Sequence, residues 1–263
     1  MPSKCVVQSL WIGPKLSTLE ILSILSFIKC GHIFHLYTYE PVKNIPPGVK
    51  VLDANKILPF HELEMIKKDQ LPFSDIFRYK MLYEKGGYWV DLDMVCLKPL
   101  QFRQKYVFSS ERTIQKGGLR NRKGTFTSNI GILKAPAKSP FYFKVYEECM
   151  KKIKKKGKSS KNIEFMILMK KYIPQFGLQK YIKEPHLFCP LDWWNVKEAF
   201  YPPCCPDKYG VFGEDQKIML EHSYTIHLWR SLMRKRKIDP DKIYSQDSIY
   251  EILKDKYLSG VEK

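Results

Sequence analysis

Short β-rich apolar runs alternate with helical runs in the N-terminal third of the chain, and this order restricts the fold more than any other feature. Residues 5–13, 32–40 and 48–54 are typical of strands, whereas residues 17–31 and 72–87 carry the capping residues and closing glycines of helices. The strand–helix–strand order predicts an α/β fold whose mainly parallel sheet is flanked by helices. The 263 residues, 44% of them apolar and 14% aromatic, suffice to bury a sizeable core.

Two aspartates interrupt the apolar run that follows the second helix. Asp91 and Asp93 come after a glycine pair and an aromatic pair, and side chains two apart in an extended segment share one face. Carboxylates this close repel each other unless a cation compensates them, and a hard ion such as Mg²⁺ or Mn²⁺ binds carboxylates and substrate phosphates together. The D-x-D motif therefore predicts a metal–diphosphate site at the carboxyl end of a strand. A solvated turn is the other interpretation of such a motif.

Residues 73–100 resemble the signature of the DXD-containing sugar-transfer enzymes of glycosyltransferase family 32, which also occurs in the glucosylating domain of large clostridial toxins. Three further stretches resemble the family pattern in the same order, namely residues 10–13, 127–136 and 224–230. The resemblance implies a retaining, metal-dependent transferase that uses a nucleotide sugar.

The resemblance also implies a domain organisation. Residues 1–235 are expected to form one GT-A-like, Rossmann-like domain, and residues 236–263 a basic helical C-terminal segment. Mn²⁺ or Mg²⁺ is the expected cofactor.

Site roles follow from the resemblance residue by residue. Trp11 is expected to stack on the nucleobase, and Asp75 and Arg78 to bind hydroxyls of the donor sugar. Asp91 would contact ribose or metal-bound water and is a further candidate metal ligand, and Asp93 would coordinate the metal. The residues expected to act in catalysis are Asp91, Asp93 and Asn129.

The remaining expected site residues come from other parts of the pattern. Asn129 would lie near the transferred sugar, while His227 and Trp229 would close over the diphosphate, with His227 as a further metal ligand. Where the family often has Tyr two residues before the first Asp, this chain has Trp89 with Tyr88 beside it, so either ring is a candidate to face the nucleotide.

Each of these side chains also has a purely structural interpretation. Asp75 and Arg78 stand three apart and can form an ion pair within one helix. Trp11 can be a core residue, and Asn129 can hydrogen-bond the local backbone. Most single histidines are not metal ligands, so the role of His227 depends on its neighbours.

The formal net charge of +18 predicts anionic partners. Basic residues gather in residues 151–161 and 230–237, where contact with an anionic membrane face and a plainly solvated surface are the two interpretations. Nucleic acid is not expected, because aromatic residues are not interleaved with these runs. Seven cysteines without a C-x-x-C pair, and no apolar run of signal-peptide or membrane-spanning length, predict a cytoplasmic chain, peripheral at a membrane surface in the membrane interpretation.

The function predicted from the sequence is retaining transfer of a sugar from a UDP- or GDP-sugar to a glycan or glycolipid acceptor. The aromatic, irregular residues 189–210 are the expected acceptor wall. A metal-dependent phosphate-ester hydrolase that uses the same D-x-D motif is one alternative, and a basic nucleic-acid-binding module is another.

Overall fold

The computed structural model describes residues 5–62, 70–113, 126–156, 166–201 and 221–260. Strands and helices alternate through its N-terminal half, as the sequence predicts. The main-sheet strands are β1 (Val6–Trp11), β2 (Ile33–Thr38), β3 (Val49–Asp53), β4 (Gly87–Val90), β6 (Val107–Arg112) and β7 (Phe126–Ala135). Two short strands, β5 (Met94–Cys96) and β8 (Thr225–His227), form a separate antiparallel pair.

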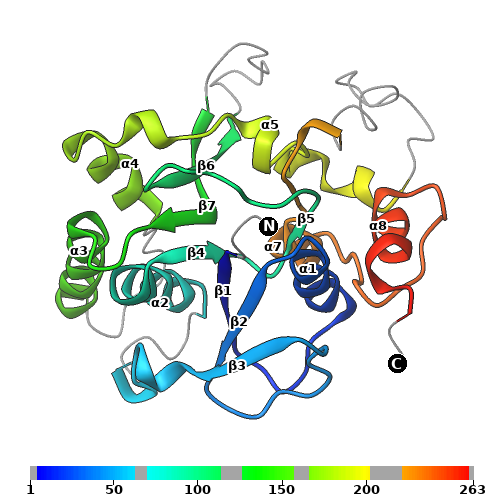
Figure 1. The fold of residues 1–263 in the computed structure, drawn as a ribbon, viewed down its shortest axis with the longest axis horizontal. Coiled ribbons are helices and arrows are strands. Elements are labelled where there is room, and N and C mark those ends of the chain that lie inside the picture. Colours follow the sequence, from blue (N-terminus) through cyan, green and yellow to red (C-terminus); the bar gives the residue numbers. More distant parts are fainter. Residues whose placement is uncertain (1–4, 63–69, 114–125, 157–165, 202–220, 261–263) are drawn as a thin grey trace.

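The main sheet has the strand order β3-β2-β1-β4-β7-β6 within the described residues (Figure 1). Strands β3, β2, β1 and β4 are parallel, and β7 is antiparallel to both β4 and β6, so β6 runs in the direction of β4. The predicted α/β fold with a mainly parallel sheet is therefore confirmed. The strand order reverses between β1 and β4, and open α/β sheets bind ligands at the carboxyl ends of strands at such a switch point.

Helices cover both faces of this sheet. The helices among the described residues are α1 (Thr18–Lys29), α2 (Gln70–Lys85), α3 (Pro140–Lys156), α4 (Met166–Gln175), α5 (Pro185–Phe188), α7 (Arg230–Lys235) and α8 (Ile249–Leu258). Short 3₁₀ turns are η1 (Ala54–Lys56), η3 (Gln179–Tyr181) and η4 (Trp193–Ala199). Figure 1 shows α2 and α3 on one side of the sheet and α1 and α8 on the other.

Two hydrophobic clusters fill the space between sheet and helices. Tyr88 and Val90 belong to the cluster beneath α1 and α8, whereas Trp89 belongs to the cluster beneath α2 and α3. Successive side chains of a strand point to opposite faces, which explains why neighbours in β4 enter different clusters.

The predicted elements agree with the structure at most positions. β1, α1, β2 and β3 lie within the predicted ranges, and α2 begins at Gln70, two residues before its predicted range. At the start of α1, the backbone N–H of Ser17 donates to Glu20 Oε2 at 2.7 Å, which forms a capping box.

The D-x-D motif departs from the predicted extended conformation. β4 ends at Val90, and Met94 N–H donates to Asp91 O at 3.0 Å, so residues 91–93 form a turn between β4 and β5. The extended prediction was wrong because the chain leaves the main sheet here to pair with β8, a partner from the far end of the sequence. The position at the carboxyl end of a strand is confirmed.

The C-terminal helix α8 packs on the same hydrophobic cluster as α1, through Ile249, Tyr250, Leu253 and Tyr257. The boundary between residues 235 and 236 stays a prediction. Among the described residues, no helix is both long enough and apolar enough to cross a membrane. Residues 157–161 of the predicted basic run and residues 202–210 of the predicted acceptor wall lie outside the described residues.

Candidate active site

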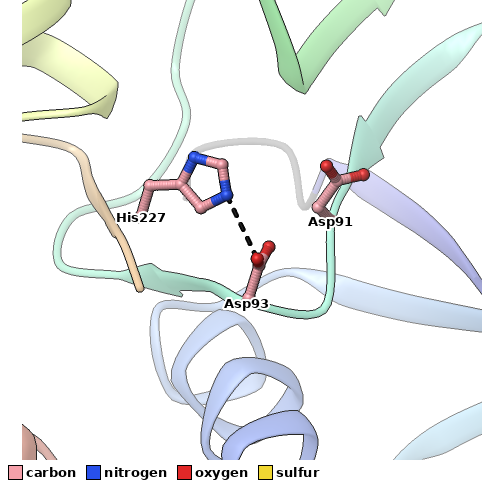
Figure 2. Close-up of side chains that lie close together, drawn as sticks. All are labelled: Asp91, Asp93 and His227. Carbon is pink, nitrogen blue, oxygen red and sulfur yellow. Dashed lines mark ion pairs between the residues drawn. The ribbon is translucent and has the colours of Figure 1, made fainter. Parts of the chain in front are cut away.

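The D-x-D turn brings three potential metal ligands together at the switch point. One ligand atom from each of Asp91, Asp93 and His227 lies within 4.8 Å of the others. Figure 2 shows the imidazole of His227 and the carboxylate of Asp93 facing one another, with Asp91 beside them. His227 pairs with Met94 in the β5–β8 ladder, so backbone hydrogen bonding fixes its distance from the turn.

Asp93 is held by the segment that ends β8 and begins α7. Its Oδ2 lies 3.2 Å from His227 Nε2 and accepts the backbone N–H of Arg230 at 2.8 Å. Burial alone would raise the pKa of Asp93, but His227 and the Arg230 N–H lower it. Burial alone would lower the pKa of His227, but Asp93 raises it well above its usual value. The protonated imidazole of His227 therefore compensates the charge of Asp93 in this structure, as a bound metal ion would.

Asp91 is held by a different set of groups. Its Oδ1 accepts hydrogen bonds from Arg78 Nη2 at 2.6 Å and from the Trp89 indole N–H at 2.7 Å. The second guanidinium nitrogen of Arg78 donates to Asp75 at 2.5 Å. Arg78 therefore forms the intrahelical ion pair that its spacing allows and also supports the first Asp of the motif.

Arg78 and Asp75 differ in how burial affects them. Arg78 is 3% exposed; burial opposes its charge, but Asp91 and Asp75 raise the pKa of the guanidinium above its usual value. Burial raises the pKa of Asp75 to about 6, although Arg78 opposes this shift. The guanidinium stays charged, so Asp91 accepts a charge-assisted hydrogen bond from Arg78 and a neutral one from Trp89.

A pocket of about 260 Å³ lies at the carboxyl ends of β1 and β2. Its lining includes Trp11, Gly13, Tyr39, Asn55 and Phe60. Trp11 is half-buried, and its indole N–H has no hydrogen-bond partner among the described residues. Gly13 has φ +149°, and a Cβ there would come within 3.4 Å of the Trp11 ring, so glycine keeps the space beside the indole open.

Arg230 links this pocket to the metal ligands. Its guanidinium lies 5.1 Å from the centroid of the Trp11 ring and forms an ion pair with the fully buried Glu20. Because the Arg230 N–H also contacts Asp93, one residue spans the distance from the pocket to the D-x-D turn.

Asn129 lies on β7, next to the D-x-D turn, and its amide is engaged by the protein. Its Oδ1 accepts the Gly131 N–H at 2.7 Å, and its Nδ2 donates to Glu111 Oε2 at 2.5 Å. A Cβ on residue 131 would lie 2.9 Å from that Oδ1, so glycine permits the contact. Sequence reasoning missed Glu111, because a single Glu before a polar stretch carries no pattern.

The three remaining aromatic candidates are largely buried. Trp229 stacks on His227 with ring centroids 3.8 Å apart, and its indole N–H donates to Leu191 O at 2.9 Å. Trp89 contacts the site through its N–H and through its ring, whose centroid lies 4.8 Å from the Arg78 guanidinium. Tyr88 packs on the opposite face of the sheet, under Lys134. Neither ring of the pair at residues 88 and 89 is exposed to a nucleotide in this structure. Direct contacts of Tyr88, Trp89 and Trp229 with substrate stay predictions.

The donor set fits a divalent cation. Two carboxylates and an imidazole are oxygen and nitrogen ligands of the kind that Mn²⁺ accepts, and three protein groups leave positions for diphosphate oxygens and water. Among the described residues, both hydrogen bonds to the Asp91 carboxylate go to Oδ1, which leaves Oδ2 available to a ligand.

Comparison with known proteins agrees with this geometry. Residues 41–113 match the model of the family described as "Glycosyltransferase sugar-binding region containing DXD motif". The matched region includes Asp75, Arg78, Asp91 and Asp93, whereas Trp11 lies outside it. The match confirms the predicted resemblance to DXD-containing sugar-transfer enzymes over these residues and supports the predicted class of enzyme, a glycosyltransferase.

One further protein is similar to this chain in sequence, and one solved structure is similar to it in fold. The "Ribosome quality control complex subunit 2" of Saccharomyces cerevisiae is 29% identical over 136 residues, and the chain covers 13% of the length of that protein. The solved structure of the PaToxG glycosyltransferase has a TM-score of 0.47 at 15% identity, over 67% of this chain and 72% of that chain.

Proposed function

We propose that this chain is a metal-dependent, retaining glycosyltransferase that moves a sugar from a UDP- or GDP-sugar to a hydroxyl of a glycan or glycolipid. The observation that carries the proposal is the convergence of Asp91, Asp93 and His227 within 4.8 Å, beside a pocket of a size suited to a nucleobase. The match of residues 41–113 to a DXD-containing sugar-binding region supports the same reaction class.

The proposed donor lies along the carboxyl edge of the sheet. The base enters the pocket and stacks on Trp11, with Tyr39 and Phe60 as further apolar walls. The diphosphate then runs past Arg230 toward Asp93, because Arg230 contacts both Trp11 and Asp93. The sugar follows toward Asp75 on the side of α2.

Mn²⁺ is the proposed ion, because His227 supplies a nitrogen ligand beside two carboxylates, whereas Mg²⁺ favours all-oxygen shells. When bound, the ion stabilises the negative charge that develops on the departing nucleoside diphosphate. Asp91, Asp93 and His227 are the proposed ligands. Arg78 and Trp89 orient Asp91 through hydrogen bonds to its Oδ1.

Transfer breaks the bond from the anomeric carbon to the phosphate oxygen and forms a bond from that carbon to the acceptor oxygen. Retention is compatible with a covalent intermediate and with front-face attack, in which the leaving diphosphate takes the proton of the acceptor hydroxyl. NMR of the first-formed product tests retention directly, and an inverted anomeric configuration would refute it.

A panel of UDP- and GDP-sugars, with and without Mn²⁺, tests the donor assignment. A cognate donor at a hundredfold excess over its Kd should stabilise the folded chain by about 2.7 kcal/mol in a thermal-shift assay, and only with Mn²⁺ present. Release of inorganic phosphate without sugar transfer would favour the phosphate-ester hydrolase instead. Binding of random oligonucleotides that weakens with salt and ignores Mn²⁺ would favour the nucleic-acid-binding alternative.

A cytoplasmic location with peripheral membrane contact also stays a proposal. It rests on the formal net charge of +18 and on Arg234 and Lys235, the basic residues in the last turn of α7. Co-sedimentation with vesicles that contain anionic lipid, but not with neutral vesicles, is the expected result, and equal binding to both would refute it.

A further inference from the structure

Glu111 is a carboxylate near the end of β6 that none of the predicted roles includes. Its Oε2 accepts the Asn129 amide at 2.5 Å, and no ion pair to it occurs among the described residues. Burial raises the pKa of Glu111, although Asn129 and the more distant His227 and Lys170 oppose this shift. A partly buried carboxylate held by an amide instead of a cation costs stability, and such groups are concentrated at functional sites.

The sheet places Glu111 on the same edge as the D-x-D turn. β6 and β4 run in the same direction on either side of β7, so their carboxyl ends lie at one edge. Along this edge come the Trp11 pocket, then Asp91, then Asn129 and finally Glu111. A donor with its base in the pocket, its diphosphate at the D-x-D turn and its sugar toward Asp75 therefore leaves the part of this edge at Asn129 and Glu111 to the acceptor.

The residues next to Glu111 belong to the segment expected to contact the acceptor, which begins at residue 189. Arg112 Nη1 donates to Asp192 Oδ1 at 2.8 Å and to Pro190 O at 3.2 Å, which fastens that segment to β6. Since neighbouring residues of a strand point to opposite sides, Arg112 serves this attachment while Glu111 turns toward Asn129. The charge of Asp192 is thus compensated and that of Glu111 is not.

We propose that Glu111 binds the acceptor, with Oε1 accepting a hydrogen bond from a hydroxyl of a pyranoside. This inference rests on the proposed function and names a part of its substrate. Among the described residues Oε1 has no hydrogen-bond partner, and an ionised carboxylate only accepts, so it selects a ligand that donates. Asn129 is the positioning residue, because Gly131 fixes its Oδ1 and its Nδ2 fixes Glu111.

The test separates donor hydrolysis from transfer to an added acceptor. The probes are the p-nitrophenyl α- and β-glycosides of glucose, galactose and mannose, with the cognate donor and Mn²⁺. In Glu111→Gln, kcat/KM for the accepted glycoside should fall about 10- to 100-fold, as for loss of one hydrogen bond to a charged group. Hydrolysis of the donor by water should change by no more than about twofold. Glu184→Gln, whose side chain is 71% exposed, is the matched control and should leave transfer unchanged.

Mono-deoxy analogues of the accepted glycoside identify the contact. With the unmodified chain, removal of one particular hydroxyl from the glycoside should lower kcat/KM for transfer. With Glu111→Gln, removal of the same hydroxyl should leave kcat/KM unchanged, because the two groups interact directly. A structural role alone would not produce that pattern. The glutamine can still accept from Asn129, so the melting temperature should not fall; if that variant unfolds, Glu111→Asp keeps the charge and should show a raised KM for the glycoside.

Each other result overturns part of the argument. If Glu111→Gln lowers donor hydrolysis as much as transfer, Glu111 acts on the donor and the acceptor role is wrong. If the donor is hydrolysed but no glycoside of the panel accepts the sugar, the pyranoside acceptor is wrong while the proposed function stands. If no UDP- or GDP-sugar reacts at all, the proposed function itself fails.

Discussion

Asp91 and Asp93 are separated by one residue, yet they are supported by opposite parts of the molecule. The partners of Asp91 are Trp89 and Arg78, which lie 2 and 13 positions away along the chain. Asp93 accepts from the backbone of Arg230, which lies 137 positions away, and from His227. The first carboxylate is thus fixed within a local strand–helix unit, and the second depends on the β5–β8 pairing.

The comparison shows two ways to hold a charge at the same site. The guanidinium of Arg78 compensates Asp91 permanently, whereas the imidazole of His227 compensates Asp93 only while it is protonated. A divalent ion can therefore replace the proton on the side of Asp93 more easily than it can displace Arg78. We expect the ion to depend most on Asp93 and the shape of the site to depend most on Asp91.

The largest effect is expected at Asp93. Asp93→Asn should lower Mn²⁺-dependent donor hydrolysis and transfer by about 10³-fold, equivalent to about 4 kcal/mol, because the ion loses its main carboxylate. Initial rates across a Mn²⁺ titration measure this. Circular dichroism of the apo protein is the control and should show a folded chain, although loss of the Asp93–His227 ion pair should lower its melting temperature. Full activity in the variant would contradict the metal assignment.

The next largest effect is expected at Trp11, which Arg230 connects to the side of Asp93. Trp11→Ala should weaken binding of the nucleoside diphosphate by about 1–3 kcal/mol, the range for stacking of a base on an aromatic ring. Isothermal titration gives the affinity. An unfolded variant would show that Trp11 is a core residue, and an unchanged Kd would place the base elsewhere.

A smaller effect is expected on the side of Asp91. Trp89→Phe keeps an aromatic ring in the core but removes the hydrogen bond to Asp91, which should cost about 1–1.5 kcal/mol, or about 5- to 10-fold in turnover. Arg78 still contacts the carboxylate, which limits the loss. Steady-state kinetics at saturating donor measure it, and a loss as large as that of Asp93→Asn would remove the distinction between the two carboxylates.

The smallest effect is expected at Tyr88, the neighbour of Trp89. Its hydroxyl is buried without a hydrogen-bond partner among the described residues, and its ring lies on the face of the sheet away from Trp89. Tyr88→Phe should change turnover and stability by less than about 0.5 kcal/mol. A marked rise in KM for the donor would restore Tyr88 as the ring that faces the nucleotide.

Much of the site could be predicted from the sequence, because the patterns that indicate it are local. The spacing of Asp75 and Arg78 on one helix, and the position of Asp91 after a predicted strand, follow from helical and strand periodicity. The extended conformation predicted for residues 91–93 was wrong, since the chain turns there to meet β8. No pattern near Glu111 indicates that it contacts Asn129, because that contact depends on the pairing of β6 with β7.

The sequence by itself determined the α/β class, the order of the first strands and helices, and the D-x-D motif, because these depend on residue periodicity and on turn residues. The resemblance already predicted His227 as a metal ligand beside Asp93. Only the tertiary structure decided that Arg230 meets Asp93, that Arg230 lies over Trp11, and that Glu111 lies on the same edge as the D-x-D turn. The physical reason is that strand pairing between distant segments fixes these contacts, and pairing depends on how whole surfaces pack together, which no short stretch of sequence specifies.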